Sequence, residues 1–295
     1  MTSIVFVNHW HYGDLFSTRG LVADIKRQLP DYNFVYAHNK SPWAVADICK
    51  TLSKTQTEKV LSHFINMNQR MGKNGDTYFI NTWVGCYSGA GLWGPNTHPS
   101  YLSHYKIFEE CYRNMNEFLG TNMVLDSDVW NYIPEIDYTL YNTKAADDFL
   151  ASVGKTHLIC NGAVQSTQSS MGNMQTIIET LAAKYPNDAF VATEMFENIA
   201  TNIYFTDSIF QKTCDICEIS YLSTRVNLVV GKNSGPFTYS NTKQNLQDPS
   251  KKLICFSHNP EDTLPYGLEF AAEFVFSDTT DDTIAVEIIE KAINE

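Results

Sequence analysis

The chain has 295 residues, of which 43% are hydrophobic and 18% are charged, and its formal net charge at pH 7 is -12. This length predicts one large or two modest domains, and the composition is that of a folded protein rather than of a disordered chain. Binding to a nucleic-acid backbone normally requires a broad basic surface, so the acidic balance argues against nucleic acid as a main partner.

The N-terminal sequence and the cysteines predict a soluble, cytoplasmic protein. The apolar run 4–7 stands without the basic stretch and long hydrophobic segment of a secretion signal. No hydrophobic run approaches the roughly 20 residues that span a bilayer, so we expect no stable membrane insertion. Cys49, Cys160 and Cys255 lie in apolar segments, as buried reduced thiols do, and we expect no structural disulfide.

The first part of the chain begins in the order strand, helix, strand. Residues 4–8 are apolar, 15–29 carry apolar residues at helical spacing, and 33–37 are again apolar and aromatic. This order is typical of a parallel sheet, which binds ligands at the carboxyl ends of its strands, so residues 8–15 form a candidate site. Further along we expect a helix within 42–71, a strand over 77–84 and a helix over 101–119.

The same pattern restarts in the second half of the chain. Weak periodicity over 120–150 places a domain boundary there, and we divide the chain into domains 1–145 and 146–295. The second domain is predicted to contain strands 157–160, 189–193, 228–231 and 253–257 and helices 173–185 and 283–293. The predicted fold class is therefore α/β, with two Rossmann-like domains facing a cleft in which ligands bind.

The loop after the strand 228–231 is suited to a phosphate group. It runs Gly231-Lys232-Asn233-Ser234-Gly235-Pro236-Phe237-Thr238 and supplies glycine, one lysine and neutral hydrogen-bond donors without a carboxylate. It lacks the Gly-Lys-Ser/Thr order of a P-loop, which argues against ATP hydrolysis of that type. The residues leave open the alternative of a polar turn after a buried strand.

Asp14 stands beside the expected start of the first helix, where its charge would repel a bound phosphate. A carboxylate at this edge of a sheet can instead take a proton from a substrate hydroxyl, and the helix start would keep it ionised and weakly basic. The alternative is a plain helix cap, a position that aspartate favours.

Three other groups of polar residues have structural interpretations. His9 and His11 could form a metal-binding pair, but alternate residues of an extended segment also point the same way for packing. The segment 214–217 has the Cys spacing of a redox pair without the other features of such a motif, so we expect it to pack in a helix. The acidic pairs 147–148 and 281–282 are expected at solvated helix starts.

Three segments resemble the lipopolysaccharide heptosyltransferase-like glycosyltransferases, the family of ADP-heptose type. Residues 8–30, beginning Asn8-His9-Trp10-His11-Tyr12-Gly13-Asp14, resemble the Gly-Asp loop and first helix of that family. Residues 158–194 resemble its strand, polar loop, helix and strand at the start of the donor domain, and 227–236 resemble its Ser-Gly-Pro donor loop. The stretch 31–157 is largely unmatched.

The resemblance implies a GT-B fold and an inverting, metal-independent transfer of a sugar from a nucleotide-sugar to a hydroxyl of a glycan or glycolipid. No cofactor is implied besides the nucleotide-sugar co-substrate. Domain 1–145 would bind the acceptor and domain 146–295 the donor. Asp14 falls at the position of the family's base, with His9 and His11 as further catalytic candidates. The implied donor-binding residues are Gly162, Gln165, Ser166, Glu194, Lys232, Asn233, Ser234, Gly235, Pro236 and Thr238.

Acceptor-binding residues are expected among the aromatic side chains of the first domain. Trp10 and Tyr12 lie beside Asp14, and Tyr87 and Trp93 lie in the glycine-rich loop 85–99. Flat apolar rings pack on sugar rings, and the glycines would allow the loop to move. We therefore expect this loop to form part of the acceptor wall; the alternative is a structural loop that folds onto its own core.

Two departures from the family keep other functions open. Thr238 and Tyr239 stand where the family often has a histidine after Ser-Gly-Pro, and 163–170 lacks the usual basic residue. The alternatives are a nucleotide-sugar epimerase and a degenerate member that only binds a sugar or a nucleotide. An epimerase would be expected to use more acid and base groups around one sugar, for which the donor region offers only Glu194 and Glu197.

Overall fold

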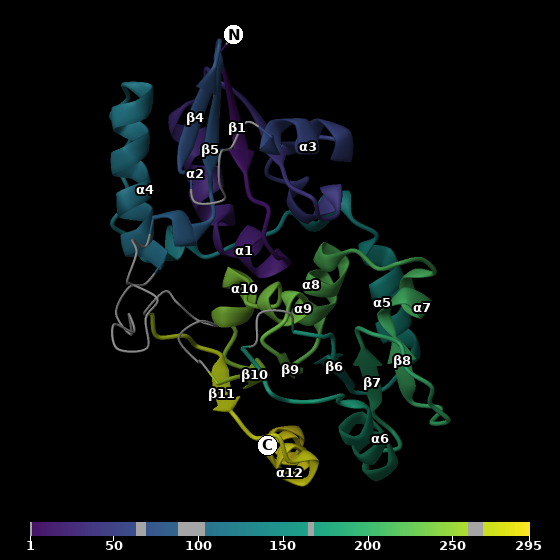
Figure 1. Ribbon diagram of the computed structural model, residues 1–295. Coiled ribbons are helices and arrows are strands. Elements are labelled where there is room, and N and C mark those ends of the chain that lie inside the picture. The colour runs from purple at the N-terminus through teal and green to yellow at the C-terminus, as the bar shows by residue number, and fades with distance from the viewer. Residues whose placement is uncertain (1, 63–68, 88–103, 165–167, 259–267) are drawn as a thin grey trace. The chain divides into compact units, whose positions relative to one another are not determined.

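The computed structural model describes residues 2–62, 69–87, 104–164, 168–258 and 268–295 (Figure 1). Contacts within the chain divide it into two compact units, with the main boundary between Glu135 and Ile136. Each unit is built on a largely parallel sheet flanked by helices, which confirms the predicted α/β fold class.

The sheet of the first unit has the strand order β3-β2-β1-β5-β4. Strands β1 (Ser3–Val7), β2 (Asn33–Ala37), β3 (Lys50–Thr51) and β5 (Thr77–Asn81) are parallel, and β4 (Met71–Asn74) pairs antiparallel with β5. Val5 lies in register with Val35 on one side and Phe79 on the other, so apolar side chains of three strands meet in the core. Gly75, with a φ of 58°, makes the tight turn between β4 and β5.

The expected helix 15–29 is divided in two. Helix α1 (Tyr12–Ser17) and helix α2 (Arg19–Gln28) are joined at Thr18, whose backbone leaves the helical region. Helix α2 packs closely on η3 (Val129–Tyr132), a short 3-10 helix, because residue 20 is a glycine. A Cβ atom there would lie 2.3 Å from the carbonyl oxygen of Tyr132.

The helical stretch expected around 42–71 is only partly helical. This stretch holds the 3-10 helix η1 (Pro42–Val45), strand β3, helix α3 (Lys54–Leu61) and the start of β4. Ser53 and Gln56 form a capping box that begins a new helix at Lys54, and this local signal was missed. The first unit also contains η2 (Val84–Cys86) and α4 (His104–Leu119).

The second unit has the strand order β11-β10-β9-β6-β7-β8, and every pair is parallel. Its strands are β6 (Thr156–Cys160), β7 (Ala189–Ala192), β8 (Ile203–Phe205), β9 (Leu228–Lys232), β10 (Lys252–Phe256) and β11 (Glu273–Ser277). Helices α6 (Gln175–Lys184) and α12 (Asp282–Asn294) lie together in Figure 1 and share one apolar core with the central strands. This core is where the strongest apolar runs of the sequence meet.

The remaining helices of the second unit explain two of the polar groups in the sequence. They are η4 (Tyr138–Leu140), α5 (Thr143–Ser152), α7 (Thr206–Phe210), α8 (Ile216–Arg225), α9 (Gly235–Thr238) and α10 (Lys243–Leu246). Asp215 caps α8 and Cys217 is buried in it, as the packing interpretation expects, whereas Cys214 precedes the helix and is only partly buried. Asp281 caps α12 as expected, but Asp147 lies inside α5 and accepts a hydrogen bond from the Tyr221 hydroxyl at 2.9 Å.

All seven cysteines lie among the described residues, and each is a thiol that takes part in no disulfide there. Across the part of the chain that the structure describes, no helix combines the length and the apolar character needed to cross a membrane.

Candidate functional site

The first candidate site lies where the strand order of the first unit reverses. The chain leaves β1 toward β2 and β3 on one side and returns to β5 on the other, so the loops after β1 and β5 diverge at this edge. Ligands of open parallel sheets bind at such points. Asn8 accepts a hydrogen bond from the Trp10 backbone N–H at 3.1 Å, and Asn81 accepts one from Trp83 N–H at 3.0 Å. The two indole rings then meet with centroids 4.6 Å apart.

Asp14 is anchored within this aromatic loop. Its carboxylate accepts a hydrogen bond from the His11 backbone N–H at 3.1 Å in the first turn of α1 and another from the Trp83 side chain. Partial burial raises the pKa of Asp14, and these hydrogen bonds oppose the rise without cancelling it. The expectation of a weakly basic carboxylate is therefore corrected, because loss of hydration outweighs the helix start. A raised pKa makes Asp14 a stronger base, while its contact with His11 N–H also makes it a cap.

Several aromatic residues stand close to Asp14 in the sequence. His9 is half-buried, and burial lowers its pKa. The Trp10 indole N–H is buried and has no hydrogen-bond partner among the described residues. Tyr12 accepts a hydrogen bond at its hydroxyl from the Ser41 N–H at 3.3 Å. Within the described residues no three metal-ligating side chains gather, so His9 and His11 are not part of such a cluster there.

The glycine-rich loop is described only at its start. Tyr87 is 4% exposed, and its hydroxyl donates a hydrogen bond to the Asn81 carbonyl at 2.8 Å. The ring therefore closes the end of β5 instead of offering a face to an acceptor, which corrects the place that the sequence predicted for it. Trp93 lies outside the described residues.

The second candidate site lies where the strand order of the second unit reverses, between β6 and β9. Asn161 follows β6 and joins the ends of two strands, since its Nδ2 donates to the Glu194 carbonyl at 2.9 Å and its Oδ1 accepts from Glu194 N–H at 2.8 Å. Gly162 allows the Glu194 carboxylate to come close, because a Cβ atom on residue 162 would lie 2.9 Å from Glu194 Oε1. Glu194 is thus held beside the first donor loop.

The segment Lys232-Asn233-Ser234 at the end of β9 is an unusual group of buried polar side chains. They are 6%, 7% and 6% exposed. Lys232 donates to the Gly172 carbonyl at 3.3 Å, and burial lowers its pKa, which the nearby Glu194 carboxylate opposes. Asn233 Nδ2 and Ser234 Oγ are shielded from solvent and have no hydrogen-bond partner among the residues that the structure describes. A simple polar turn gives no reason for two neighbouring buried groups without partners.

The rest of the predicted donor loop starts the next helix. Gly235 and Pro236 begin α9, and Thr238 donates its hydroxyl to the Ser234 carbonyl at 2.9 Å, so its side chain is engaged within the turn. Of the other predicted donor residues, Gln165 and Ser166 lie outside the described residues.

The structure adds one residue that the sequence did not single out. His258 follows β10 as Asn233 follows β9, and its Nε2 lies 2.8 Å from the Ser170 hydroxyl in the loop after β6. The His258 N–H also donates to the Gln168 carbonyl at 3.0 Å. No local sequence motif marks His258, because its place follows from the strand order.

Comparisons with solved structures extend over the whole chain. E. coli ADP-heptose lipopolysaccharide heptosyltransferase II has a TM-score of 0.59 at 10% identity and covers 100% of this chain and 99% of its own. A family 9 glycosyl transferase from Veillonella parvula has a TM-score of 0.54 at 12% identity and covers 98% and 91%. A protein from Listeria monocytogenes assigned as a UDP-N-acetylglucosamine 2-epimerase has a TM-score of 0.52 at 8% identity and covers 100% and 88%.

No protein-family model matches the sequence, and no curated protein matches it. The structural similarity therefore speaks for the fold. With its two parallel-sheet α/β units, the chain has the fold of the GT-B glycosyltransferase structures, heptosyltransferases among them, as the resemblance in the sequence implied.

Proposed function

We propose that this protein is a glycosyltransferase that moves a sugar from a nucleotide-sugar to a hydroxyl group of a glycan or glycolipid acceptor. The observation that carries the proposal is a pair of buried donors, Asn233 Nδ2 and Ser234 Oγ, that have no partner within the described part of the chain and lie where the second sheet reverses its strand order. The fold and the position of Asp14 in the first unit support it.

The second unit is proposed to hold the diphosphate of the donor. A buried donor without an acceptor costs about 1–3 kcal/mol, and a phosphate oxygen would remove that cost for Asn233 and Ser234. The buried ammonium of Lys232, which contacts Gly172 of the β6 loop, brings positive charge to the same place. Similar structures have been solved for an E. coli heptosyltransferase with ADP and for S. aureus MnaA with UDP, which fits a nucleotide diphosphate ligand here.

Asp14 is proposed to be the base. As the acceptor hydroxyl attacks the anomeric carbon, its proton passes to the Asp14 carboxylate, and the bond between that carbon and the diphosphate oxygen breaks. The nucleoside diphosphate leaves with the bonding electrons, and a single displacement inverts the configuration. We propose that Lys232 and the neutral donors stabilise the leaving group in place of a metal ion.

Epimerisation of the nucleotide-sugar is the second candidate function. The carboxylate of Glu194, held beside Gly162 and near Lys232, is a base in the donor region itself. A structure assigned to this activity shares the fold. The two reactions differ in their need for an acceptor, since epimerisation changes the nucleotide-sugar in its absence.

The first test measures binding of ADP-sugars, UDP-sugars and GDP-sugars. Thermal denaturation detects which of them bind, and calorimetry then measures their affinity. A ligand at 100 times its dissociation constant stabilises a protein by about 2.7 kcal/mol, which thermal denaturation detects easily. Any nucleotide-sugar that binds is then incubated with and without acceptors, and released nucleoside diphosphate and the sugar's configuration are measured by NMR. Consumption without an acceptor, with formation of an epimer, would replace the transferase proposal with the epimerase.

The second test replaces Asn233 and Ser234 by alanine together. Loss of hydrogen bonds to a charged phosphate costs about 1.5–3 kcal/mol each, so donor affinity should fall at least tenfold. The unliganded variant should be no less stable than the wild type, because the donors removed have no partner to lose among the described residues. Ser208→Ala, at an exposed position of α7, is the matched control. Unchanged donor affinity in the double variant would remove the basis of the proposed site.

A further inference from the structure

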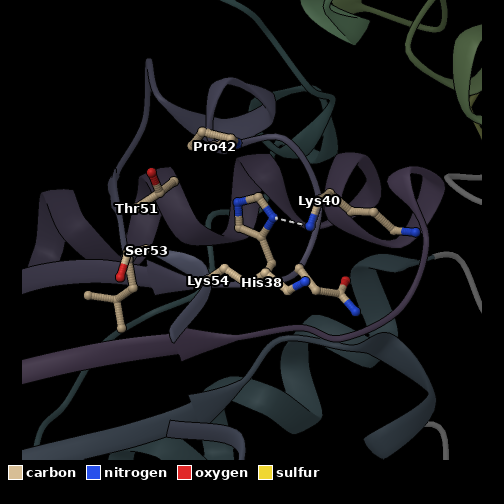
Figure 2. A pocket seen from close by; sticks show the side chains of 8 residues that line it. His38, Lys40, Pro42, Thr51, Ser53 and Lys54 are labelled. Carbon is tan, nitrogen blue, oxygen red and sulfur yellow. Dashed lines mark hydrogen bonds between the residues drawn. The ribbon is translucent and has the colours of Figure 1, made fainter. Parts of the chain in front are cut away.

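A pocket of about 370 Å³ opens at the carboxyl ends of β2 and β3 in the first unit (Figure 2). Its walls come from 38–42, directly after β2, and from 51–54, where β3 ends and α3 begins. The volume lies at the small end of the range of about 300–1,000 Å³ for small-molecule sites, enough for one monosaccharide unit. None of the residues predicted from the sequence lines it.

His38 forms the inner wall of this pocket and is only 4% exposed. Its Nδ1 accepts a hydrogen bond from the Lys40 backbone N–H at 3.2 Å, the dashed line in Figure 2. Burial and the charge of Lys40 lower the pKa of His38 to about 4, so the ring is neutral at pH 7. With Nδ1 as the acceptor, the proton of the neutral ring is on Nε2.

The Nε2–H group of His38 is therefore a donor, and it has no partner among the described residues. Figure 2 shows this second ring nitrogen on the side of the ring that faces Thr51. It is shielded from solvent, so a ligand oxygen would have to displace neighbouring side chains to reach it. Such a donor is favourable only when a ligand supplies the acceptor.

The charged residues of the pocket wall have one sign. Lys40 and Lys54 are the charged residues of the lining, which contains no carboxylate. The hydroxyls of Thr51 and Ser53 add neutral donors. In a chain with a formal net charge of -12, a pocket with two lysines and no acidic side chain is a local exception that favours an anion.

We propose that this pocket binds an oxyanion, the carboxylate or phosphate group of a sugar-sized ligand, through the Nε2–H of His38 and the ammonium groups of Lys40 and Lys54. Binding as such does not depend on the proposed transferase activity. If that activity holds, the anion belongs to the acceptor, because the pocket lies on the same sheet edge as Asp14. Tyr12 joins the two places, since Lys40 Nζ lies 5.7 Å from the centroid of its ring.

The test is NMR titration of the whole chain, read at the amides of 38–42 and 51–54 and at the His38 imidazole. The probes are glucose 6-phosphate, glucuronate and uncharged glucose, and inorganic phosphate alone separates recognition of the anion from recognition of the sugar. Both charged sugars, or one of them, should shift these signals in a saturable manner, and glucose should not. Equal response to glucose, or no response to any anion, would overturn the proposal.

Variants assign the effect to the residues. His38→Asn keeps an oxygen near the position of Nδ1 and removes the Nε2 donor, and Lys54→Gln removes one charge; each should weaken binding at least tenfold. Lys59→Gln, on an exposed position of α3 outside the pocket, is the control and should leave affinity unchanged. Wild-type affinity in both pocket variants would overturn the assignment. Nucleotide-sugar binding is read separately, so a failure of the transferase proposal leaves this result intact.

Discussion

Replacing Asp14 by asparagine separates the two functions that its carboxylate combines. Asparagine retains an oxygen that can accept the hydrogen bond from the His11 N–H, now at 3.1 Å, so the start of α1 should be preserved. It cannot accept the proton of an attacking hydroxyl. Loss of a general base typically costs 10²- to 10⁴-fold in rate, so turnover should fall by about that factor while donor affinity stays the same.

Because the pKa of Asp14 is raised, its replacement by asparagine is not expected to lower the free energy of unfolding at pH 7. A carboxyl whose pKa is higher in the folded than in the unfolded protein stabilises the fold below the unfolded pKa, and this contribution is lost as the pH rises through the folded value. At pH 7 the charged carboxylate is therefore less favourable than a neutral group of the same shape. Asp14→Asn should leave the free energy of unfolding at pH 7 unchanged or higher, and the difference from the wild type should shrink as the pH falls toward 3.

The assay pairs initial rates with urea unfolding at pH 7 and at acid pH. Asp282→Asn is the control, because Asp282 also lies in the first turn of a helix, α12, and lies in the other unit. Wild-type turnover together with reduced stability in Asp14→Asn would identify Asp14 as a cap alone and refute the base. The base would then have to be sought at His9 or His11.

Three further substitutions test a close backbone contact, a buried charge and the position of Glu194. Gly20→Ala should destabilise the protein by about 1–3 kcal/mol in urea unfolding, because the new Cβ would lie 2.3 Å from the Tyr132 carbonyl oxygen; an unchanged midpoint would contradict the close contact. Lys251 donates to two buried carbonyls, and burial lowers its pKa from 10.5 to about 8. Because this pKa is lower in the folded protein, the free energy of unfolding of the wild type should increase as the pH is raised from about 8 to 10.5. Lys251→Met should abolish that increase. Gly162→Ala should displace the Glu194 carboxylate and raise the donor KM, with the acceptor KM unchanged as the internal control.

Local patterns in the sequence predict a strand or helix correctly where a single element occupies the segment. The apolar runs at β1, β6 and β9 predict buried parallel strands, because strands covered on both faces need no polar alternation. The helical stretch expected around 42–71 is divided, because its apolar residues belong to several short elements. The capping box at Ser53 was the available signal against it.

The candidate sites could be predicted only in part, because burial and pairing depend on residues far apart in the chain. The sequence pattern selects Asp14 and Ser234 as candidates from their loops, and their roles stay predictions. It assigned Tyr87 to a surface, although the turn after β5 buries its ring. No sequence motif marks His38, a lone histidine after a strand. Its candidacy follows from a buried ring nitrogen that has no partner within the described ranges, which depends on the folded structure.

The same strand reversal places a carboxylate in the first unit and a lysine with neutral donors in the second. In both units the polypeptide leaves the first strand at the reversal of strand order, and an asparagine, Asn8 or Asn161, fixes the loop through its side chain. After β1 the loop leads to the half-buried carboxylate of Asp14, whose raised pKa suits it to accept a proton. Beside β6, the loop from β9 supplies the lysine and neutral donors that suit a diphosphate. The Glu194 carboxylate also lies in this region, near Lys232, so the proposed diphosphate site depends on the lysine and the neutral donors outweighing that negative charge.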